Sequence, residues 1–306
     1  LTELDRRHLV HPVSSFRGHE ARGVRLIRAA KGARVTDADG RELIDGFAGL
    51  WCVNAGYGQE SVVDAAARQM RELPYATGYF DLGAEAPIRL AAALAERAPG
   101  DLNHVYFTLG GSDAVDSTIR FIRYYWHAKG QPGRDQFISV ASGYHGSTSM
   151  GAGLTALPLF HDGFGLPFDW QHKIASHDLY RNPLADDPQA VIAASVAELQ
   201  AKIEEIGAER VAAFYVEPIQ GSGGVLVPPP GWIKPMRDHH DAVWSASCAR
   251  SAYKRADSSF IPVVPFVASP KPAFIPLRCP ICAYSCVAIA KGPAADIVMP
   301  APDQTT

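Results

Sequence analysis

Apolar strand-like segments alternate with amphipathic helices over residues 104–218, and this alternation limits the possible folds more than any other feature. Three segments carry the apolar character of buried strands, and they read HVYFTL, QFISVA and AAFYVEP. Strands of this kind, separated by helices, are typical of a mostly parallel sheet with helices on both faces. The sequence therefore predicts an α/β fold built as a three-layer αβα sandwich.

Two helices of this region have a clear apolar face, because their apolar residues recur at intervals of three and four. In the first helix, which Gly130 ends, the face consists of Val115, Ile119, Ile122 and Trp126. In the second, where Gly207 is the predicted C-cap, it consists of Ile192, Val196, Leu199, Ile203 and Ile206. Both helices are expected to pack on the sheet.

The N-terminal region has a different pattern. Residues 23–44 predict a hairpin, because apolar and polar residues alternate in VRLIRA and ARVTD and the turn ADGRELID follows. Ser61 and Asp64 form a capping-box pattern that predicts a helix start. The apolar residues expected to be buried by this helix are Val62, Val63, Ala66, Met70 and Leu73. Pro87 suits the first turn of a further helix.

Composition excludes several classes of function. The 306 residues contain 29 Lys and Arg against 32 Asp and Glu, a formal net charge of −3. This balance gives no basic surface for nucleic acid or an acidic membrane. No apolar run approaches the roughly 20 residues of a membrane span, and the start LTELDRRHLVHP has no signal-peptide pattern. A cytoplasmic protein with no nucleic-acid or membrane partner is expected.

Three polar, glycine-containing stretches follow the predicted strands: LGGSDA, SGYHGST and EPIQGSGG. In open α/β sheets, ligands bind outside the carboxyl ends of the strands. In the first stretch, Gly110, Gly111 and Ser112 lie where a helix begins. Unpaired N–H groups and the positive end of the helix dipole can hold a phosphate there. Alternatively, Ser112 is a plain N-cap of its own helix.

The second stretch supplies two aromatic rings, and the third supplies a carboxylate. Tyr144 and His145 offer surfaces against which a flat heteroaromatic ligand can lie; alternatively, Tyr144 packs its own loop and His145 is hydrogen bonded. Glu217 ends its strand just before Pro218, where a carboxylate near a buried site must pair or shift its pKa. A structural ion pair is the alternative for Glu217.

Long segments of the chain resemble the class III aminotransferases, in particular the branch that acts on omega-amino acids or amines with pyruvate. These segments are FAGLWCVNAGYG, MRELPYATGYF, FTLGGSDAVDSTIRFIRYYWHAKGQP, GYHGSTSMGAGLTA and VEPIQGSGGVLVPPPGW. The resemblance extends from Leu1 to about Asp238. It implies the type I fold of transferases that depend on pyridoxal 5'-phosphate (PLP), and a homodimer with active sites at the subunit interface.

The resemblance also implies roles for single residues. The cofactor phosphate would bind at Gly110, Gly111 and Ser112, and Tyr144 would lie over the pyridine ring with His145 beside it. Glu217 would support the acid that faces the ring nitrogen, and Trp51 would line the substrate pocket. The implied reaction moves an amino group from an omega-amino acid or amine to pyruvate, through pyridoxamine phosphate (PMP).

The C-terminal part departs from the family. A DEVxxGFGR segment, whose Asp pairs with the ring nitrogen, does not occur, and the positions expected for that Asp and for the Schiff-base lysine fall near Arg250 and Cys279. Lys291, in AIAKGPA, is the candidate catalytic lysine, but it lies about a dozen residues late. A solvated lysine is the favoured interpretation. The alternative function is therefore a truncated chain or pseudoenzyme that binds the cofactor phosphate without turnover.

Composition changes in the same region. Residues 244–306 contain no Glu, one Gly and nine of the 23 Pro, which opposes regular helices and central strands. A tail read from another frame would have this composition. The cysteines of this tail are Cys248, Cys279, Cys282 and Cys286, and they lack the paired spacing of most four-thiolate sites, so no metal site is predicted.

The predicted organisation has three parts. Residues 1–60 form an N-terminal arm and the hairpin of a small domain, and residues 61–243 form an incomplete, cofactor-binding α/β domain. Residues 244–306 form an irregular tail rich in Pro and Cys, which is foreign to the family.

Overall fold

The computed structural model describes residues 1–98, 102–238 and 287–291. The described residues divide into two compact units, one that ends at Leu82 and one that begins at Gly83. The division lies later than the predicted boundary at residue 60, because the helix that follows this position stays with the first unit. Within the described part of the chain, no helix has both the length and the apolar character that a membrane span needs.

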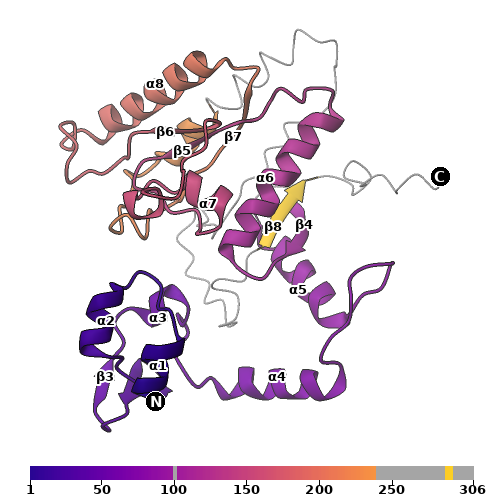
Figure 1. Cartoon of the computed structure of the whole chain (residues 1–306). Helices are drawn as coiled ribbons and strands as arrows, with labels where there is room; N and C mark the ends of the chain where they lie inside the picture. Colours follow the sequence, from indigo (N-terminus) through magenta and orange to yellow (C-terminus); the bar gives the residue numbers. More distant parts are fainter. Residues whose placement is uncertain (99–101, 239–286, 292–306) are drawn as a thin grey trace. The chain divides into compact units, whose positions relative to one another are not determined.

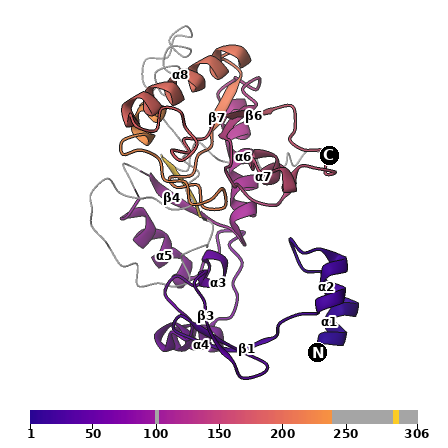
Figure 2. The same cartoon turned by 90° about the vertical axis from the view of Figure 1, so that its left-hand side faces the viewer.

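The first unit combines short helices with a small antiparallel sheet (Figures 1 and 2). Its elements are α1 (Thr2–His8), α2 (Phe16–Arg22), β1 (Ile27–Lys31), β2 (Arg34–Asp37), β3 (Glu42–Ile44), α3 (Ala48–Trp51) and α4 (Glu60–Glu72). The sheet has the order β1-β2-β3, with Lys31 opposite Arg34 and Val35 opposite Leu43. The predicted hairpin is thus confirmed and gains a third strand.

Two predictions about α4 are wrong. The helix begins at Glu60 and its N-cap residue is Gln59, which makes no side-chain capping bond, so Ser61 and Asp64 do not form a capping box. The second error concerns burial: no residue of α4 is buried, and Val63 and Met70 are 54% and 67% exposed. The apolar face exists, but within its own unit nothing described covers it.

The second unit holds the predicted alternation of helices and strands. Its elements are α5 (Glu85–Ala95), β4 (Leu102–Phe107), α6 (Gly111–Ala128), β5 (Gln136–Val140), α7 (Ser149–Leu154), the 3₁₀ helix η1 (Pro158–Phe160), β6 (Gln171–Ile174), α8 (Pro188–Ile206), β7 (Val211–Phe214) and β8 (Val287–Lys291). Strands β6, β5 and β7 form a parallel sheet in that order. Pro87 lies in the first turn of α5, as predicted.

Strand β4 does not join this parallel sheet among the described residues. It pairs with β8 in antiparallel register, with Phe107 opposite Val287 and Leu102 opposite Lys291. An unpaired strand edge offers a row of free N–H and C=O groups, which the apolar VAIAK segment satisfies. Residues 287–291 are therefore a strand and not irregular, whereas the rest of the predicted tail lies outside the described residues.

Helices cover both faces of the β6-β5-β7 sheet (Figure 1), as the sequence predicts. On one face, α6 packs its predicted stripe against the sheet in a cluster of Val115, Ile119, Ile122, Trp126, Phe137, Leu154, Ala212, Ala213 and Tyr215. On the other face, α8 packs Ile192, Leu199, Ile203 and Ile206 against Ile138, Val140, Ile174, Val211 and Phe214. Gly207 ends α8 with φ +92°, so the predicted C-cap is confirmed.

Trp126 ties α6 to the sheet with a hydrogen bond, and this bond gives the first prediction. Its indole Nε1 donates to the carbonyl oxygen of Ala212 at 3.1 Å, and the side chain is 3% exposed. Trp126→Phe removes the donor and leaves a buried carbonyl without this partner, which we expect to cost about 1–2 kcal/mol of unfolding free energy. Urea unfolding measures the loss. Trp170→Phe, at a half-buried ring on the same sheet face, is the control, and equal losses in both variants would contradict the role of the bond.

Candidate functional site

The start of α6 and the loop after β5 meet at Ser112. The Ser112 Oγ accepts a hydrogen bond from the backbone N–H of Ser147 at 2.9 Å, although 35 residues separate the two in sequence. Gly146 makes this approach possible, since a Cβ atom there would lie 2.8 Å from Ser112 Oγ and 2.9 Å from Ser112 Cα. The first two glycine-containing stretches of the sequence are thus brought together, as predicted for strand ends.

Ser112 is not the N-cap of α6, so the simpler alternative for this residue is wrong. Gly110 occupies the N-cap position, and the first helical bond runs from the Ala114 N–H to the Gly110 carbonyl. Asp113 turns its carboxylate back onto the N–H of Leu109. Because Gly111 and Ser112 are in the first turn, their N–H groups have no acceptor within the helix. They form the start of a helix that carries a positive partial charge.

Asp116 holds the same loop one turn further along α6. Its Oδ1 accepts from Thr148 Oγ1 at 2.7 Å and from the N–H of Gly151 at 3.0 Å. Ser112 and Asp116 are four residues apart, so they lie on one face of the helix. This face therefore fixes both ends of the loop between Gly146 and Gly151.

Glu217 connects the end of β7 to the same loop. Its Oε2 accepts from the backbone N–H of Tyr144 at 2.8 Å and its Oε1 accepts from the N–H of Gly221 at 3.3 Å. Burial raises the pKa of the Glu217 carboxyl to about 7, against the lowering effect of the two N–H groups. No ion pair to Glu217 occurs among the described residues, so the alternative of a structural ion pair finds no support there.

Tyr144 and His145 have different surroundings, although they are neighbours in sequence. The Tyr144 ring is half-buried and meets Phe160 edge-to-face at 5.5 Å. The His145 ring is buried, meets Tyr215 edge-to-face at 6.0 Å, and its backbone N–H donates to Thr155 Oγ1 at 2.8 Å. Burial, helped by the charge on Lys173, lowers the pKa of His145 to about 3, so the ring is neutral.

The buried imidazole of His145 has a ring nitrogen, Nε2, without a hydrogen-bond partner among the described residues. A Cβ atom at Gly143 would lie 3.2 Å from this nitrogen and 3.4 Å from Glu217 Oε2. The imidazole and the carboxyl therefore flank Gly143 at the base of the loop that carries Tyr144.

The raised pKa of Glu217 makes the stability of the chain depend on pH. The folded state binds this proton more tightly than the unfolded state, so the carboxyl costs stability as pH rises through the window between its ordinary pKa of 4.5 and about 7. Glu217→Gln removes this cost. As the pH rises from 5 to 8, we expect the unfolding free energy of the variant to increase by about 2 kcal/mol relative to that of the wild type.

Urea unfolding at the two pH values measures the effect. Glu209→Gln, which changes an exposed carboxyl, removes the same charge and serves as the control. A difference between wild type and E217Q that stays constant with pH would contradict the raised pKa.

The structure brings together most of the predicted site, but not all of it. Contacts connect Ser112, Tyr144, His145 and Glu217 through one loop, and Gly110 and Gly111 begin the helix beside it. The backbone of Lys291 lies opposite Leu102, at the end of β4 that is remote from Gly110. Trp51 belongs to the other unit, where its ring contacts Phe47 at 6.4 Å.

Three residues that shape this site are not among the residues predicted from the sequence: Asp116, Ser147 and Thr155. Asp116 had a usable signal, because it lies four residues after Ser112 on the same helix face. Thr155 connects the loop through bonds to the N–H of His145 and the carbonyl of Gly146. No sequence pattern indicates Ser147 or Thr155, since their partners depend on how the loop folds back.

Comparison with known proteins identifies the family. The family model described as aminotransferase class-III matches residues 17–242. Putrescine–pyruvate aminotransferase of Pseudomonas aeruginosa is 40% identical over 235 residues, which cover 77% of this chain and 52% of that protein. Omega-amino acid–pyruvate aminotransferase of Pseudomonas putida is 34% identical over 221 residues, covering 71% of this chain and 48% of that protein. The chain spans about half the length of these relatives.

Solved structures of related proteins support the same family. The omega transaminase from Pseudomonas jessenii, solved in complex with PMP, superimposes with a TM-score of 0.77 at 33% identity, covering 79% of this chain and 54% of that one. This likeness confirms the predicted fold class, the type I fold of PLP-dependent transferases. Family and fold together support PLP as the cofactor predicted from the sequence. The chain belongs to the class III aminotransferases.

Proposed function

We propose that this chain acts in the transfer of an amino group from an omega-amino acid or amine to pyruvate, with PLP as cofactor. The relatives support the reaction, because their names specify putrescine or an omega-amino acid as donor and pyruvate as acceptor. One observation carries the proposal to this chain. The Ser112–Ser147 bond places the positive start of α6 against the loop that bears Tyr144.

The residues present fit the phosphate end of the cofactor. The N–H groups of the first turn of α6 supply donors and a positive partial charge, as phosphate sites at helix starts require. A Cβ atom at Gly110 would meet no atom within 4 Å, so there is room beside the backbone at this point. The buried Nε2 of His145, which has no hydrogen-bond partner in the part of the chain that the structure describes, lies at the base of the same loop.

When bound, PLP supplies an electron sink that stabilises negative charge on the reacting carbon of the substrate. The chain's own residues bind and orient it. We propose that Gly110, Gly111 and Ser112 hold the phosphate and that the Tyr144 ring covers the pyridine. Glu217 fixes the backbone of Tyr144 through its N–H, and so sets the position of that ring.

We also propose that the protein is a homodimer, with Trp51 lining the substrate pocket, and that it is cytoplasmic. The exposed apolar face of α4, with Val63 and Met70, supports the dimer because large exposed apolar patches mark interaction surfaces. Analytical ultracentrifugation with Met70→Glu as the test variant, and Arg68→Glu as a control at an exposed polar site, checks the subunit contact.

The experiment that tests the function loads the full chain with PLP, removes free cofactor by gel filtration, and assays alanine formation from pyruvate with putrescine or β-alanine. We expect retained cofactor. Alanine formation would extend the transfer reaction to this chain and would require a Schiff-base lysine, which the sequence does not provide at the family's position. A chain that retains PLP without forming alanine would support the alternative of phosphate binding without turnover. A chain that retains no PLP would contradict the assignment of the site.

Lys291 has a test of its own. Borohydride fixes PLP covalently to a lysine with which it has condensed, and peptide mapping identifies that lysine. Because the Lys291 backbone lies at the remote end of β4, we expect Lys291→Ala to retain as much PLP as the wild type, with Lys129→Ala as control. Loss of the fixed cofactor in K291A alone would instead assign the catalytic role to Lys291.

A further inference from the structure

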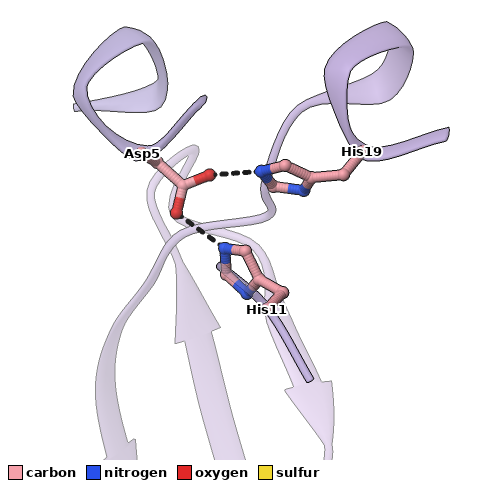
Figure 3. A group of neighbouring side chains, drawn as sticks. All are labelled: Asp5, His11 and His19. Carbon is pink, nitrogen blue, oxygen red and sulfur yellow. Dashed lines mark hydrogen bonds and ion pairs between the residues drawn. The ribbon is translucent and has the colours of Figure 1, made fainter. Parts of the chain in front are cut away.

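Three metal-ligating side chains converge in the first unit, outside the site described above. Figure 3 shows Asp5 of α1 between the rings of His11, in the loop that follows, and His19 of α2. The carboxylate Oδ1 lies 2.8 Å from Nε2 of His11, and Oδ2 lies 2.7 Å from Nε2 of His19. One carboxylate oxygen and one ring nitrogen from each histidine all lie within 4.8 Å of one another.

The cluster is largely shielded from water. The side chains of Asp5, His19 and His11 are 9%, 13% and 26% exposed. Such burial is unusual for three polar groups on a surface segment of two short helices, because each loses hydration that its partners must replace. The polar atoms of these three side chains therefore need partners within the cluster.

Only one of the two contacts between Asp5 and the histidines is a hydrogen bond. His11 Nε2 and Asp5 Oδ1 form a hydrogen bond. Asp5 Oδ2 and His19 Nε2 lie 2.7 Å apart as an ion pair, charged only when the imidazole is protonated, and they make no well-directed hydrogen bond among the described residues. Since their separation suits a bond, the direction of the ring nitrogen is what fails. The contact between Asp5 and His19 is thus an ion pair and not a well-directed hydrogen bond.

We propose that Asp5, His11 and His19 bind a divalent transition-metal ion, with Zn²⁺ as the ion that suits them best. Imidazole nitrogen and carboxylate oxygen are common zinc ligands, at about 2.0–2.2 Å from the ion. A cation between the three side chains would bind Asp5 and His19 at once, in place of the ion pair between them. No metal site is predicted from the sequence, where only the cysteine spacing is informative; Asp5, His11 and His19 lie in three separate segments and follow no zinc-site spacing.

Two neutral imidazoles that share one carboxylate are the competing arrangement. It requires an N–H donor directed at each oxygen; the geometry suits such a bond at His11, whereas the His19 contact is an ion pair without a well-directed hydrogen bond among the described residues. The two rings lie 4.5 Å apart at 42°, so they are close enough to serve one ion and are not stacked face to face. The metal-bound arrangement accounts for all three side chains.

The ion would join α1 to α2 across the loop that carries His11. Neither helix has a buried residue, so apolar packing contributes little to holding them together. Binding to the folded arrangement would stabilise the N-terminal segment in proportion to ion concentration. The role inferred is therefore structural, and it is independent of PLP.

The test uses the full chain, stripped with a chelator and with its cysteines alkylated so that thiols cannot bind metal. Zn²⁺ is titrated in competition with a chromophoric chelator. We expect one Zn²⁺ per chain, an affinity at least about tenfold lower in His11→Gln and in His19→Gln, and unchanged binding in His8→Gln. His8 is exposed in the same segment and is the matched control.

A second measurement uses the wild-type chain and does not depend on variant folding. Diethyl pyrocarbonate modifies accessible histidines, and peptide mapping reports each one. Zn²⁺ is expected to protect His11 and His19 but not His8. The proposal is overturned if the wild type binds no Zn²⁺, if H19Q binds it as tightly as the wild type, or if all three histidines react equally with and without the ion.

Discussion

Replacing Ser112 with Asp is expected to lower the affinity for PLP at least about 100-fold while leaving the cofactor-free chain as stable as the wild type, or more stable. Like charges placed side by side cost several kcal/mol, and about 2.7 kcal/mol corresponds to a factor of 100. By contrast, an acid in the first turn of a helix is favourable by about 0.3–1 kcal/mol. Fluorescence titration with PLP and thermal unfolding measure the two effects.

A loss of PLP affinity without a loss of stability is expected if the helix start binds the phosphate. It is not expected if Ser112 only stabilises the start of the helix. Gln189→Asp places the same charge at the corresponding second residue of α8 and is the matched control. It should leave PLP binding unchanged. If S112D bound PLP as tightly as the wild type, the phosphate would not lie at the start of α6.

Gly146→Val is expected to separate the loop from the helix start, costing about 3 kcal/mol of unfolding free energy and most of the PLP binding. Gly146 has φ +120°, a conformation that a β-branched residue avoids, and its added Cβ would lie 2.8 Å from Ser112 Oγ. The contact atoms include the Ser112 Cα, so a simple rotation of the serine side chain does not relieve the clash. Denaturant unfolding and PLP titration are the measurements.

Gly133→Val is the control for this substitution. A Cβ at Gly133 would meet no atom within 4 Å, and its φ is not positive. If both valine variants behaved alike, the close approach of Gly146 to Ser112 would not matter for binding.

The sequence predicts the helices of the second unit well because their signals are local. The stripe from Val115 to Trp126 marks one face of α6, and Gly207 marks the end of α8, without reference to any other segment. The failures concern contacts between distant segments. Periodicity shows that Val63 and Met70 share a face of α4, but it does not show what covers that face, and the structure leaves it exposed.

The same distinction holds for the site. Strand ends predict that the stretches bearing Ser112, Tyr144 and Glu217 gather at one edge. They do not predict that Ser112 accepts from Ser147, nor that Glu217 holds the backbone of Tyr144 rather than another side chain. Those bonds depend on how the loop returns over α6, which has no signature in the local sequence. The antiparallel pairing of β4 with β8 is equally non-local.

The most direct test of this account compares PLP with pyridoxal, which lacks the phosphate, on the wild-type chain and on S112D. If the start of α6 holds the phosphate, the wild type will bind PLP far more tightly than pyridoxal, and S112D will lose that preference while its affinity for pyridoxal stays the same. Equal affinity of the wild type for both compounds, or an unchanged preference in S112D, would contradict it.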